Sequence, residues 1–471
     1  MGDNNTVTAS NKALKAGLWY TISSISVRAI GIITTPLYTR LLTTSDYGRV
    51  STLTSWYSIL SVFVAMALYY SIGRAKIDFP GKLESYVGSL QLFCGMVTAL
   101  LALICFVFLQ PVSQLLGMSE TFTIVLIIYL IAEPAIILNQ NKFKYQYKYK
   151  SNIAISLYTT IATLTFSFLL IFLSPDRGLG RALGIVVPAV LLSLGLWFYE
   201  IRHGYLKFNK EYIVYGLKIS LPLIFHTISL SVLAQSDRLA ISQFCGEDKT
   251  AIYSLAYQYA VLIDIVLNAV GQAWLPWFHD TYATGNLSLI REKIKPLIVL
   301  GGMLAVGAVS LAPEAIFILG PEEYQSGVWV VGPVVLGTYA KYIFQNYEHV
   351  ELHLKKTWYI SAATILAAVL NVFLNYIFIP RYGFIAAAYT TLFCYICLFV
   401  LHCLIVRLIL KQNAYSDFYF YASFLVACLL CVGMMLLYNH TIIRLTLLAI
   451  IMVIYLTSNR NIIREFFNRK K

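Results

Sequence analysis

The stretch SLPLIFHTISLSVLAQSDRLAISQFCGEDKTAIYSLAYQYA, from Ser220 to Ala260, decides what kind of fold this chain adopts. Its apolar run carries an adjacent acid and base, Asp237 and Arg238. It turns through Gly246-Glu247-Asp248-Lys249 and then re-enters an apolar, aromatic run. Ionisable residues inside hydrocarbon are energetically costly, so they usually mark a transport pathway or a substrate contact. The stretch therefore predicts two membrane-spanning helices with functional charges near the turn that joins them.

The composition of the whole chain indicates the same class. Of its 471 residues, 59% are hydrophobic and 12% are charged, and the mean hydropathy is +0.72. A soluble protein of this size could not hide so much apolar surface in one core, so we expect an all-α protein that crosses the membrane many times. The first ten residues are polar, and the apolar run 13–42 is too long for the core of a signal peptide, so we expect no cleavable signal.

A transmembrane helix needs about 20 mostly apolar residues. By that rule the chain holds about fourteen candidate spans. Several are longer than one simple span, which indicates tilt or extension beyond the bilayer. The candidate spans are 13–40, 47–72, 85–109, 121–141, 151–174, 182–201, 212–244, 250–279, 294–312, 328–350, 357–379, 384–410, 416–437 and 441–458.

The distribution of lysine and arginine tests this map. If the N-terminus lies in the cytoplasm and the sides alternate, the cytoplasmic segments hold roughly four times as many of the 35 Lys and Arg residues as the outer segments. If one span were missed, all later segments would change sides in the count, and the asymmetry would be lost. The pattern therefore supports fourteen spans with both termini in the cytoplasm. It also explains the net charge of +13 without a nucleic-acid partner.

Two pairs of similar motifs indicate an internal repeat. The motif SPDRGLGRAL (174–183) matches IPRYGFIAAA (379–388), and Arg40-Leu41 matches Arg238-Leu239. Both pairs lie about 200 residues apart, which favours a parallel duplication of six helices plus six. We therefore predict an N-terminal lobe over 1–206, a second lobe over 207–411, and two further helices with a basic tail over 412–471.

Three stretches carry a resemblance to a known family. They are TTPLYTRLLTTSDYG (34–48), LPLIFHTISLSVLAQSDRLAISQFCGEDKTAIYSLAYQYA (221–260) and NVFLNYIFIPRYGFIAAAYTT (371–391). In these stretches the chain resembles the multidrug/oligosaccharidyl-lipid/polysaccharide (MOP) exporter superfamily. Within it, the chain is most similar to the Wzx-type polysaccharide (O-antigen) flippases.

The resemblance implies a transporter with two six-helix lobes around a cationic cavity that opens alternately to each side. Its substrate would be an oligosaccharide repeat unit on undecaprenyl diphosphate. The unit would move from the cytoplasmic to the periplasmic leaflet of the bacterial inner membrane, for O-antigen or a related surface polysaccharide. The implied partners are membrane lipids, a coupling ion (H⁺ or Na⁺), and the polysaccharide polymerase and chain-length machinery.

Three cationic residues within spans are candidates for contact with a diphosphate, because their charge can neutralise an anion in a low-dielectric slab. Arg28 lies mid-span and is the first candidate; its alternative is an ion pair with an acid such as Asp264. Arg238 follows Asp237 near the outer end of its span, where a local pair or an interfacial position is the alternative. Lys341 lies mid-span, and its side chain could also snorkel to the inner face.

Three acidic residues are candidates for ion coupling or gating. Asp264 lies mid-span, where an unpaired carboxylate would titrate; its alternative is a pair with Arg28 or Lys341. Glu133 precedes a proline and could instead satisfy backbone groups that the proline frees. Asp237, next to Arg238, is interpreted as part of a gate or of a contact between the lobes.

Polar residues form stripes on two predicted helices. Asn268 and Gln272 follow Asp264 at helical spacing, and Asn371 and Asn375 share one face of a later helix. Such stripes either line a cavity for the substrate or hydrogen-bond between helices, and the second use is the more common one.

Two motifs with the spacing of metal sites are excluded as such. Cys394-x-x-Cys397 and Cys428-x-x-Cys431 lie within apolar spans, where a cluster of thiolates would be stranded. The motif His349-Val-Glu351-Leu-His353 differs from H-E-x-x-H and is interpreted as a charged helix end. We expect no metal, no cofactor and no catalytic residue, because no phosphate loop, nucleophile triad or carboxylate pair is visible.

Two other transport functions stay open: a multidrug/cation antiporter of the same superfamily, and a lipid II-type flippase. The antiporter would need an acid-rich cavity, because its substrates are cations. A membrane polymerase or ligase would carry a large outer loop, which the predicted map lacks.

Overall fold

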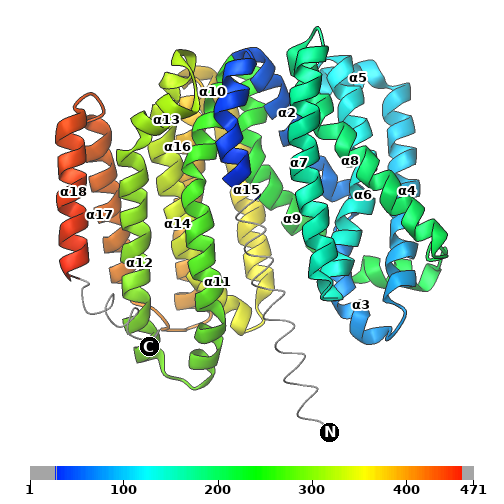
Figure 1. The fold of residues 1–471 in the computed structure, drawn as a ribbon. Helices are drawn as coiled ribbons and strands as arrows, with labels where there is room; N and C mark the ends of the chain where they lie inside the picture. Colours follow the sequence, from blue (N-terminus) through cyan, green and yellow to red (C-terminus); the bar gives the residue numbers. More distant parts are fainter. Residues whose placement is uncertain (1–26, 28, 459–471) are drawn as a thin grey trace. The chain divides into compact units, whose positions relative to one another are not determined.

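The computed structural model describes residue 27 and residues 29–458. Within this range the chain is helical and no strand is assigned, which confirms the prediction of an all-α membrane protein. The chain runs in order from α2 to α18, as labelled in Figure 1. A further helical segment, 29–41, precedes α2.

In the first part of the chain the helices are α2 (Thr44–Ala65), η1 (Leu68–Ser71), α3 (Ile72–Asp78), α4 (Leu83–Val107), α5 (Leu109–Leu116), α6 (Glu120–Tyr145), α7 (Tyr149–Leu173), α8 (Arg177–Arg202), α9 (Lys210–Cys245) and α10 (Glu247–Ala260). In the second part they are α11 (Leu262–Ala283), α12 (Leu287–Ser310), α13 (Ala312–Leu319), η2 (Glu322–Gly327), α14 (Val328–His353), α15 (Thr357–Tyr382), α16 (Ile385–Leu404), η3 (Ile405–Ile409), α17 (Asp417–Leu436) and α18 (Thr441–Ser458).

Ten helices in the described part are long and apolar enough to cross a membrane, and twelve if each of two bent pairs is one span. One bent pair joins α2 to the segment Leu68–Asp78 at 51°, and the other divides α9 between Leu221 and Leu223 at 52°. The predicted last span corresponds to the shorter apolar helix Thr441–Thr457. The predicted first span lies mostly outside the described residues. The count of fourteen therefore stays a prediction.

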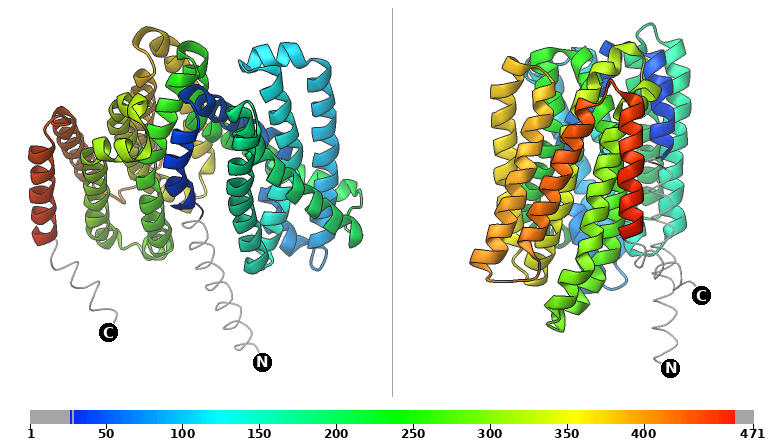
Figure 2. Two further views of the ribbon diagram at one scale, coloured as in Figure 1. Left: turned by 45° about the horizontal axis from the view of Figure 1, so that its top comes forward. Right: turned by 90° about the vertical axis from the view of Figure 1, so that its left-hand side faces the viewer.

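The chain divides into two compact units, Met1–Ala251 and Ile252–Lys471. Unit 1 thus contains α9 and the start of α10, and unit 2 begins within α10. Figure 2 shows the helices of each unit from two further directions.

Contacts between turns show that the helices of unit 1 alternate in direction. At one end, Glu84 lies 3.3 Å from both Gln146 and Lys148, so the turns before α4 and before α7 meet there. At the other end, the turns before α2, α8 and α10 meet in the contacts described below. Figure 1 accordingly shows α3 and α5 at opposite ends of this unit.

A fully buried ion pair links α6 to α8 in unit 1. Lys142 donates to the carboxylate of Glu200, and the two side chains are 1% and 0% exposed. The ammonium also lies over the rings of Phe143 and Tyr199. Lys142 directly follows the predicted span 121–141, and its burial with Glu200 was not predicted, because Glu200 lies 58 residues away and no local pattern reveals it.

In unit 2 the central helix is α14, which packs against α16, α11, α12 and α17. Its apolar window is 83% buried, the largest share among the candidate spans. Five of its buried residues are small or β-branched in one run, Val330 to Val335, and such side chains let neighbouring backbones approach closely. The polar residues of α14 therefore lie among the helices that surround it.

Candidate functional site

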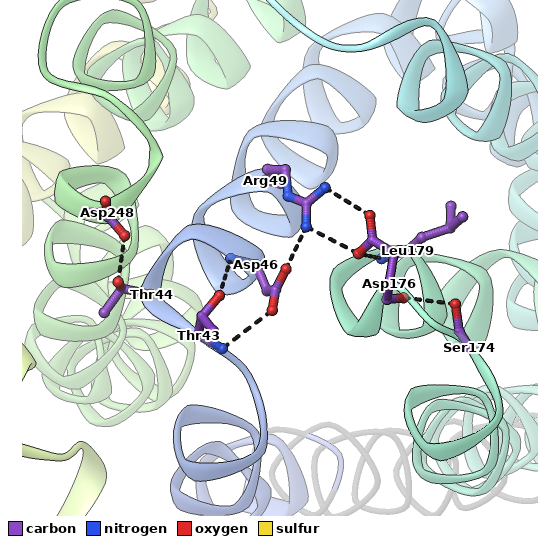
Figure 3. Close-up of polar contacts among 8 residues, drawn as sticks. All are labelled: Thr43, Thr44, Asp46, Arg49, Ser174, Asp176, Leu179 and Asp248. Carbon is purple, nitrogen blue, oxygen red and sulfur yellow. Dashed lines mark hydrogen bonds and ion pairs between the residues drawn. The ribbon is translucent and has the colours of Figure 1, made fainter.

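In unit 1, a cluster of polar residues joins the start of α2 to the start of α8 (Figure 3). Thr43 caps α2: its side chain accepts from the backbone N–H of Asp46, whose carboxylate accepts from the N–H of Thr43. Arg49, one turn further, donates to Asp46 and makes two bonds of 2.9 and 3.0 Å to Asp176. We call Thr43, Asp46, Arg49 and Asp176 the Arg49 cluster.

Asp176 has a second role in the Arg49 cluster, because it caps α8. Its carboxylate accepts from the N–H of Leu179 at 3.0 Å. Gly178 lies so close that an added Cβ would be 2.8 Å from Asp46 Oδ1 and 2.9 Å from the Arg49 guanidinium. The motif SPDRG therefore supplies a carboxylate at Asp176 and, at Gly178, a residue small enough to let Asp46 and Arg49 come close to the start of α8.

The same end of α2 contacts the α9–α10 junction. Thr44 donates to Asp248, as Figure 3 shows, and Thr52 donates to Glu247 at 2.8 Å. A Cβ on Gly48 would lie 2.0 Å from the carbonyl oxygen of Glu247, so only glycine permits this backbone approach. Helix α2 is thus connected to two turns that are distant in sequence.

At neutral pH the ionised carboxylate of Asp176 keeps its bonds to Arg49. Burial alone would raise the pKa of the Asp176 carboxyl, but the hydrogen bonds and charge of Arg49, with the N–H of Leu179, outweigh burial and lower that pKa. A depressed folded-state pKa stabilises the fold above the ordinary aspartate pKa, and this stabilisation is lost as the pH falls through the lower value. Only strong acid should release the contact.

Replacing Arg49 by alanine is expected to weaken the attachment of α8 to α2 by about 1 kcal/mol. Both side chains are about a third exposed, so a larger value does not apply. Amide hydrogen exchange at residues 176–180 should quicken about fivefold. Arg49→Lys should recover only part of the protection, because one ammonium cannot make the paired bonds. Unchanged exchange in Arg49→Ala would show that the cluster does not hold α8.

Inside unit 1, Glu133 contacts an aromatic pair. Tyr57 of α2 donates to the Glu133 carboxylate and stacks on Tyr129 at 3.6 Å between ring centres. The predicted coupling residue is therefore hydrogen-bonded to a neighbouring helix.

Asp237 and Arg238 lie in α9 as the sequence suggested. Asp237 is only 1% exposed. Arg238 donates to Gln235 at 2.7 Å and to the carbonyl oxygen of Ala234 at 3.1 Å, and Ser55 of α2 also contacts Gln235. These contacts place the acid–base pair within a polar layer between α2 and α9. Arg28, the first candidate for the diphosphate, lies outside the described residues.

In unit 2 the structure brings Asp264 and Lys341 together. Lys341 Nζ on α14 lies 3.1 and 3.2 Å from the two carboxylate oxygens of Asp264 on α11. The side chains are 30% and 20% exposed, so the pair is half-buried and accessible. The two residues were predicted separately, with this pairing as the stated alternative.

A small polar cavity of about 90 Å³ lies beside this pair. Asn268 and Gln272, predicted to share a face with Asp264, both line it, and Asn268 donates to the Asp264 carbonyl oxygen at 2.7 Å. The volume is large enough for ordered water. The other polar residues around the cavity are Tyr342, Gln345, Asn346, Glu348 and His349.

Asn371 and Asn375 connect α15 to α16. Both are fully buried. Asn371 donates to Thr391 at 3.0 Å, Asn375 donates to Asn371 at 3.1 Å, and Thr390 donates to Asn375. This arrangement favours the interhelical role; contact with a substrate stays a prediction.

Sequence reasoning missed the Arg49 cluster and misread the motif around Glu351. The stretches TTSDYG and SPDRG were noted as family or repeat markers, and their charges were left unpaired. Glu351 is fully buried, so it is not part of a solvated helix end. Within residues 29–458, no group of three or more His, Cys, Asp and Glu could hold a metal ion.

Comparison with known proteins identifies the family. The model of the family described as polysaccharide biosynthesis protein matches residues 13–282. The chain is also 23% identical over 344 residues to the Lsg locus putative protein 1 of Haemophilus influenzae, which covers 71% of this chain and 80% of that protein.

Two solved structures share the fold. One is an inward-facing multidrug resistance MATE family transporter of the MOP superfamily, with a TM-score of 0.67, 11% identity, and coverage of 83% of this chain and 98% of that one. The other is the lipid II flippase MurJ in an inward closed conformation, with a TM-score of 0.65, 15% identity, and coverage of 95% and 99%. The family match confirms the resemblance to polysaccharide proteins, and the chain belongs to the polysaccharide biosynthesis protein family.

Proposed function

We propose that this protein is a flippase that moves an oligosaccharide linked to undecaprenyl diphosphate across the bacterial inner membrane, from the cytoplasmic to the periplasmic leaflet. The product serves O-antigen or a related surface polysaccharide. The family match supports a role in polysaccharide synthesis. The observation that carries the proposal is the half-buried Lys341–Asp264 pair within spanning helices, beside a polar cavity.

Such a substrate sets three physical requirements. Its diphosphate needs cations inside a low-dielectric slab. Its sugars need a polar, hydrated surface, and its lipid tail can stay in the bilayer. Lys341 and Arg238 meet the first requirement among the described residues, together with Arg28 in the first predicted span. Asn268 and Gln272 meet the second.

The Lys341–Asp264 pair suggests how binding and release alternate. Asp264 neutralises Lys341 while no substrate is bound. An arriving diphosphate competes for the ammonium, and a proton or Na⁺ on Asp264 favours that exchange by removing the competing charge. Glu133 and Asp237 are the further candidates for coupling or gating. The protein acts by alternating access of its two lobes, with both termini in the cytoplasm.

The alternatives are a multidrug/cation antiporter and a lipid II-type flippase. The two solved structures that share this fold are a multidrug resistance MATE family transporter and the lipid II flippase MurJ. The match to the polysaccharide family favours the proposed substrate over both.

Deletion of the gene tests the proposal. We expect surface polysaccharide to disappear and single repeat units to accumulate on undecaprenyl diphosphate at the cytoplasmic face. A plasmid copy of the wild type should restore export, and an Arg28→Ala copy should not. Unchanged surface glycan with new drug sensitivity would instead support the antiporter.

A further inference from the structure

Three ionisable side chains of unit 2 meet in a group that the Asp264–Lys341 pair does not include. Glu348 and Glu351 lie one turn apart on α14, and His402 comes from the neighbouring α16. His402 Nδ1 lies 2.8 Å from Glu351 Oε1, and His402 Nε2 lies 3.6 Å from Glu348 Oε1. We call these residues the Glu–His–Glu cluster.

The cluster is buried, and part of it has no hydrogen-bond partner. The side chains of Glu351 and His402 are 0% exposed. Within the described residues, His402 Nε2 and Glu351 Oε2 have no hydrogen-bond partner. An unpartnered polar atom in the interior is energetically costly. Such atoms indicate a site that gains stability when water or a proton binds.

The charge of the cluster changes with its protons. With both glutamates ionised, a neutral imidazole leaves two negative charges in the interior. One proton on His402 turns both ring nitrogens into donors, one toward each carboxylate. A second proton, on Glu348, makes the cluster neutral. The geometry offers each proton a position, because His402 Nε2 faces Glu348 and His402 Nδ1 faces Glu351.

Glu348 gives the cluster a route to water. It is 22% exposed, and it lines the polar cavity with Asn268 and Gln272. Glu351 and His402 are 0% exposed, whereas Glu348 lines the cavity and also lies next to His402. A proton can therefore pass from cavity water to Glu348 and on to His402.

The surrounding charges leave His402 as the main counter-charge of the two glutamates. Lys341 on α14 is paired with Asp264 on α11, and Arg407 of η3 is paired with Asp417 of α17. On α12, Arg291 donates to the carbonyl oxygen of Asn413, and Lys295 lies over the ring of Tyr419. On α15, Arg381 lies in the last turn of the helix. Other titratable groups of the packed elements include His279, Tyr342, Tyr347, His349, His353, Cys403 and Tyr421.

A metal ion does not fit this arrangement. The two imidazole nitrogens point at different carboxylates, so no single point faces both nitrogens and both acids. An ion pair with a purely structural role would be expected to have all of its polar atoms hydrogen-bonded.

We propose that the Glu–His–Glu cluster is a proton-binding site that exchanges with the polar cavity and couples proton movement to transport. The step is a proton transfer alone: a hydronium ion in the cavity gives its proton to Glu348, and the proton is shared with His402. Release reverses this transfer. The coupling, but not the proton binding, rests on the proposed function.

Infrared difference spectroscopy of the purified full-length protein in nanodiscs tests the binding. Between pH of about 5 and 9, a protonated carboxyl band should appear as the pH falls. The band should be smaller in Glu348→Gln and unchanged in Glu323→Gln, a control at an exposed carboxylate of η2. A wild-type protein without such a band, or a band unchanged in Glu348→Gln, would overturn the proposal.

The coupling is tested by export of the surface polysaccharide at several external pH values. The pH dependence should flatten in Glu348→Gln and in His402→Gln, with protein levels matched by immunoblot. Full pH dependence in Glu348→Gln would overturn the coupling. If the carboxyl band titrates but the wild type exports no lipid-linked sugar under any condition, the proton site stands and the proposed function fails.

Discussion

Replacing Lys142 by alanine is expected to destabilise the folded protein by about 3–5 kcal/mol. The substitution leaves the carboxylate of Glu200 buried without its partner, since the two side chains are 1% and 0% exposed. An unpaired buried charge is far more harmful than the loss of the pair as a whole. We expect a strong fall in the melting temperature in detergent and in the yield of monodisperse protein.

The chain offers two matched controls for this result. Lys144 lies two residues further along the same helix and is exposed, so Lys144→Ala should have the melting temperature of the wild type. The double substitution Lys142→Met with Glu200→Leu removes both charges and should recover most of the stability. If Lys142→Ala and Lys144→Ala have the same melting temperature, the Lys142–Glu200 pair does not contribute the stability that we assign to it.

Replacing Lys341 by alanine is expected to reduce polysaccharide export about tenfold or more, equivalent to at least about 1.4 kcal/mol in the transport step. The ammonium contacts both oxygens of Asp264 and is half-buried. In the proposed mechanism its loss removes a cation that binds the diphosphate and leaves an acid that repels the diphosphate. Lys341→Arg should retain more export, because it keeps the charge. Export is measured as surface glycan per cell.

Stability and transport can be separated at this pair. The neutral double variant Asp264→Asn with Lys341→Met should fold at normal levels, because it leaves no lone charge, yet it should not export. Lys356→Ala, at an exposed position after α14, serves as the control. Normal export by the neutral double variant would remove the pair from the mechanism.

Hydropathy predicted most of the helices, because it depends on local composition, whereas the span count and the orientation drawn from lysine and arginine stay predictions. The predicted run 212–244 corresponds to α9, and 121–141 lies within α6. The short helices α5 and α13 were missed, since each continues the apolar run of the helix before it and only the chain direction changes. The bends within α9 and after α2 were missed because hydropathy does not report direction.

The candidate site was predicted only in part. Asp264, Lys341, Asn268 and Gln272 were found because polar residues are rare within apolar spans, and the structure brings all four to one region of unit 2. The sequence placed Asp264, Asn268 and Gln272 on one helix face and gave the pair with Lys341 only as an alternative. It could not select that pair, because Lys341 lies 77 residues further along the chain. The Arg49 cluster was missed for the same reason, because Asp176 lies 127 residues after Arg49 in the sequence.

The Glu–His–Glu cluster shows why local motifs mislead. The spacing of His349, Glu351 and His353 suggested a solvated helix end, since charges gather at such ends. The partner that buries Glu351 is His402, 51 residues further on in α16. Only the packing of α14 against α16 distinguishes a buried ionisable group from an exposed one.

The measurement that tests the central claim most directly is flipping by the purified protein in liposomes. Undecaprenyl-diphosphate-linked repeat units are placed in both leaflets, and an impermeant enzyme that modifies the sugar is added outside. Without protein, about half of the lipid should react, since only one leaflet is accessible. With wild-type protein, nearly all should react, whereas the Asp264→Asn, Lys341→Met variant should behave like empty liposomes. A reaction that stops at half with correctly folded wild-type protein, under every ion gradient applied, would contradict the assignment as a lipid-linked oligosaccharide flippase.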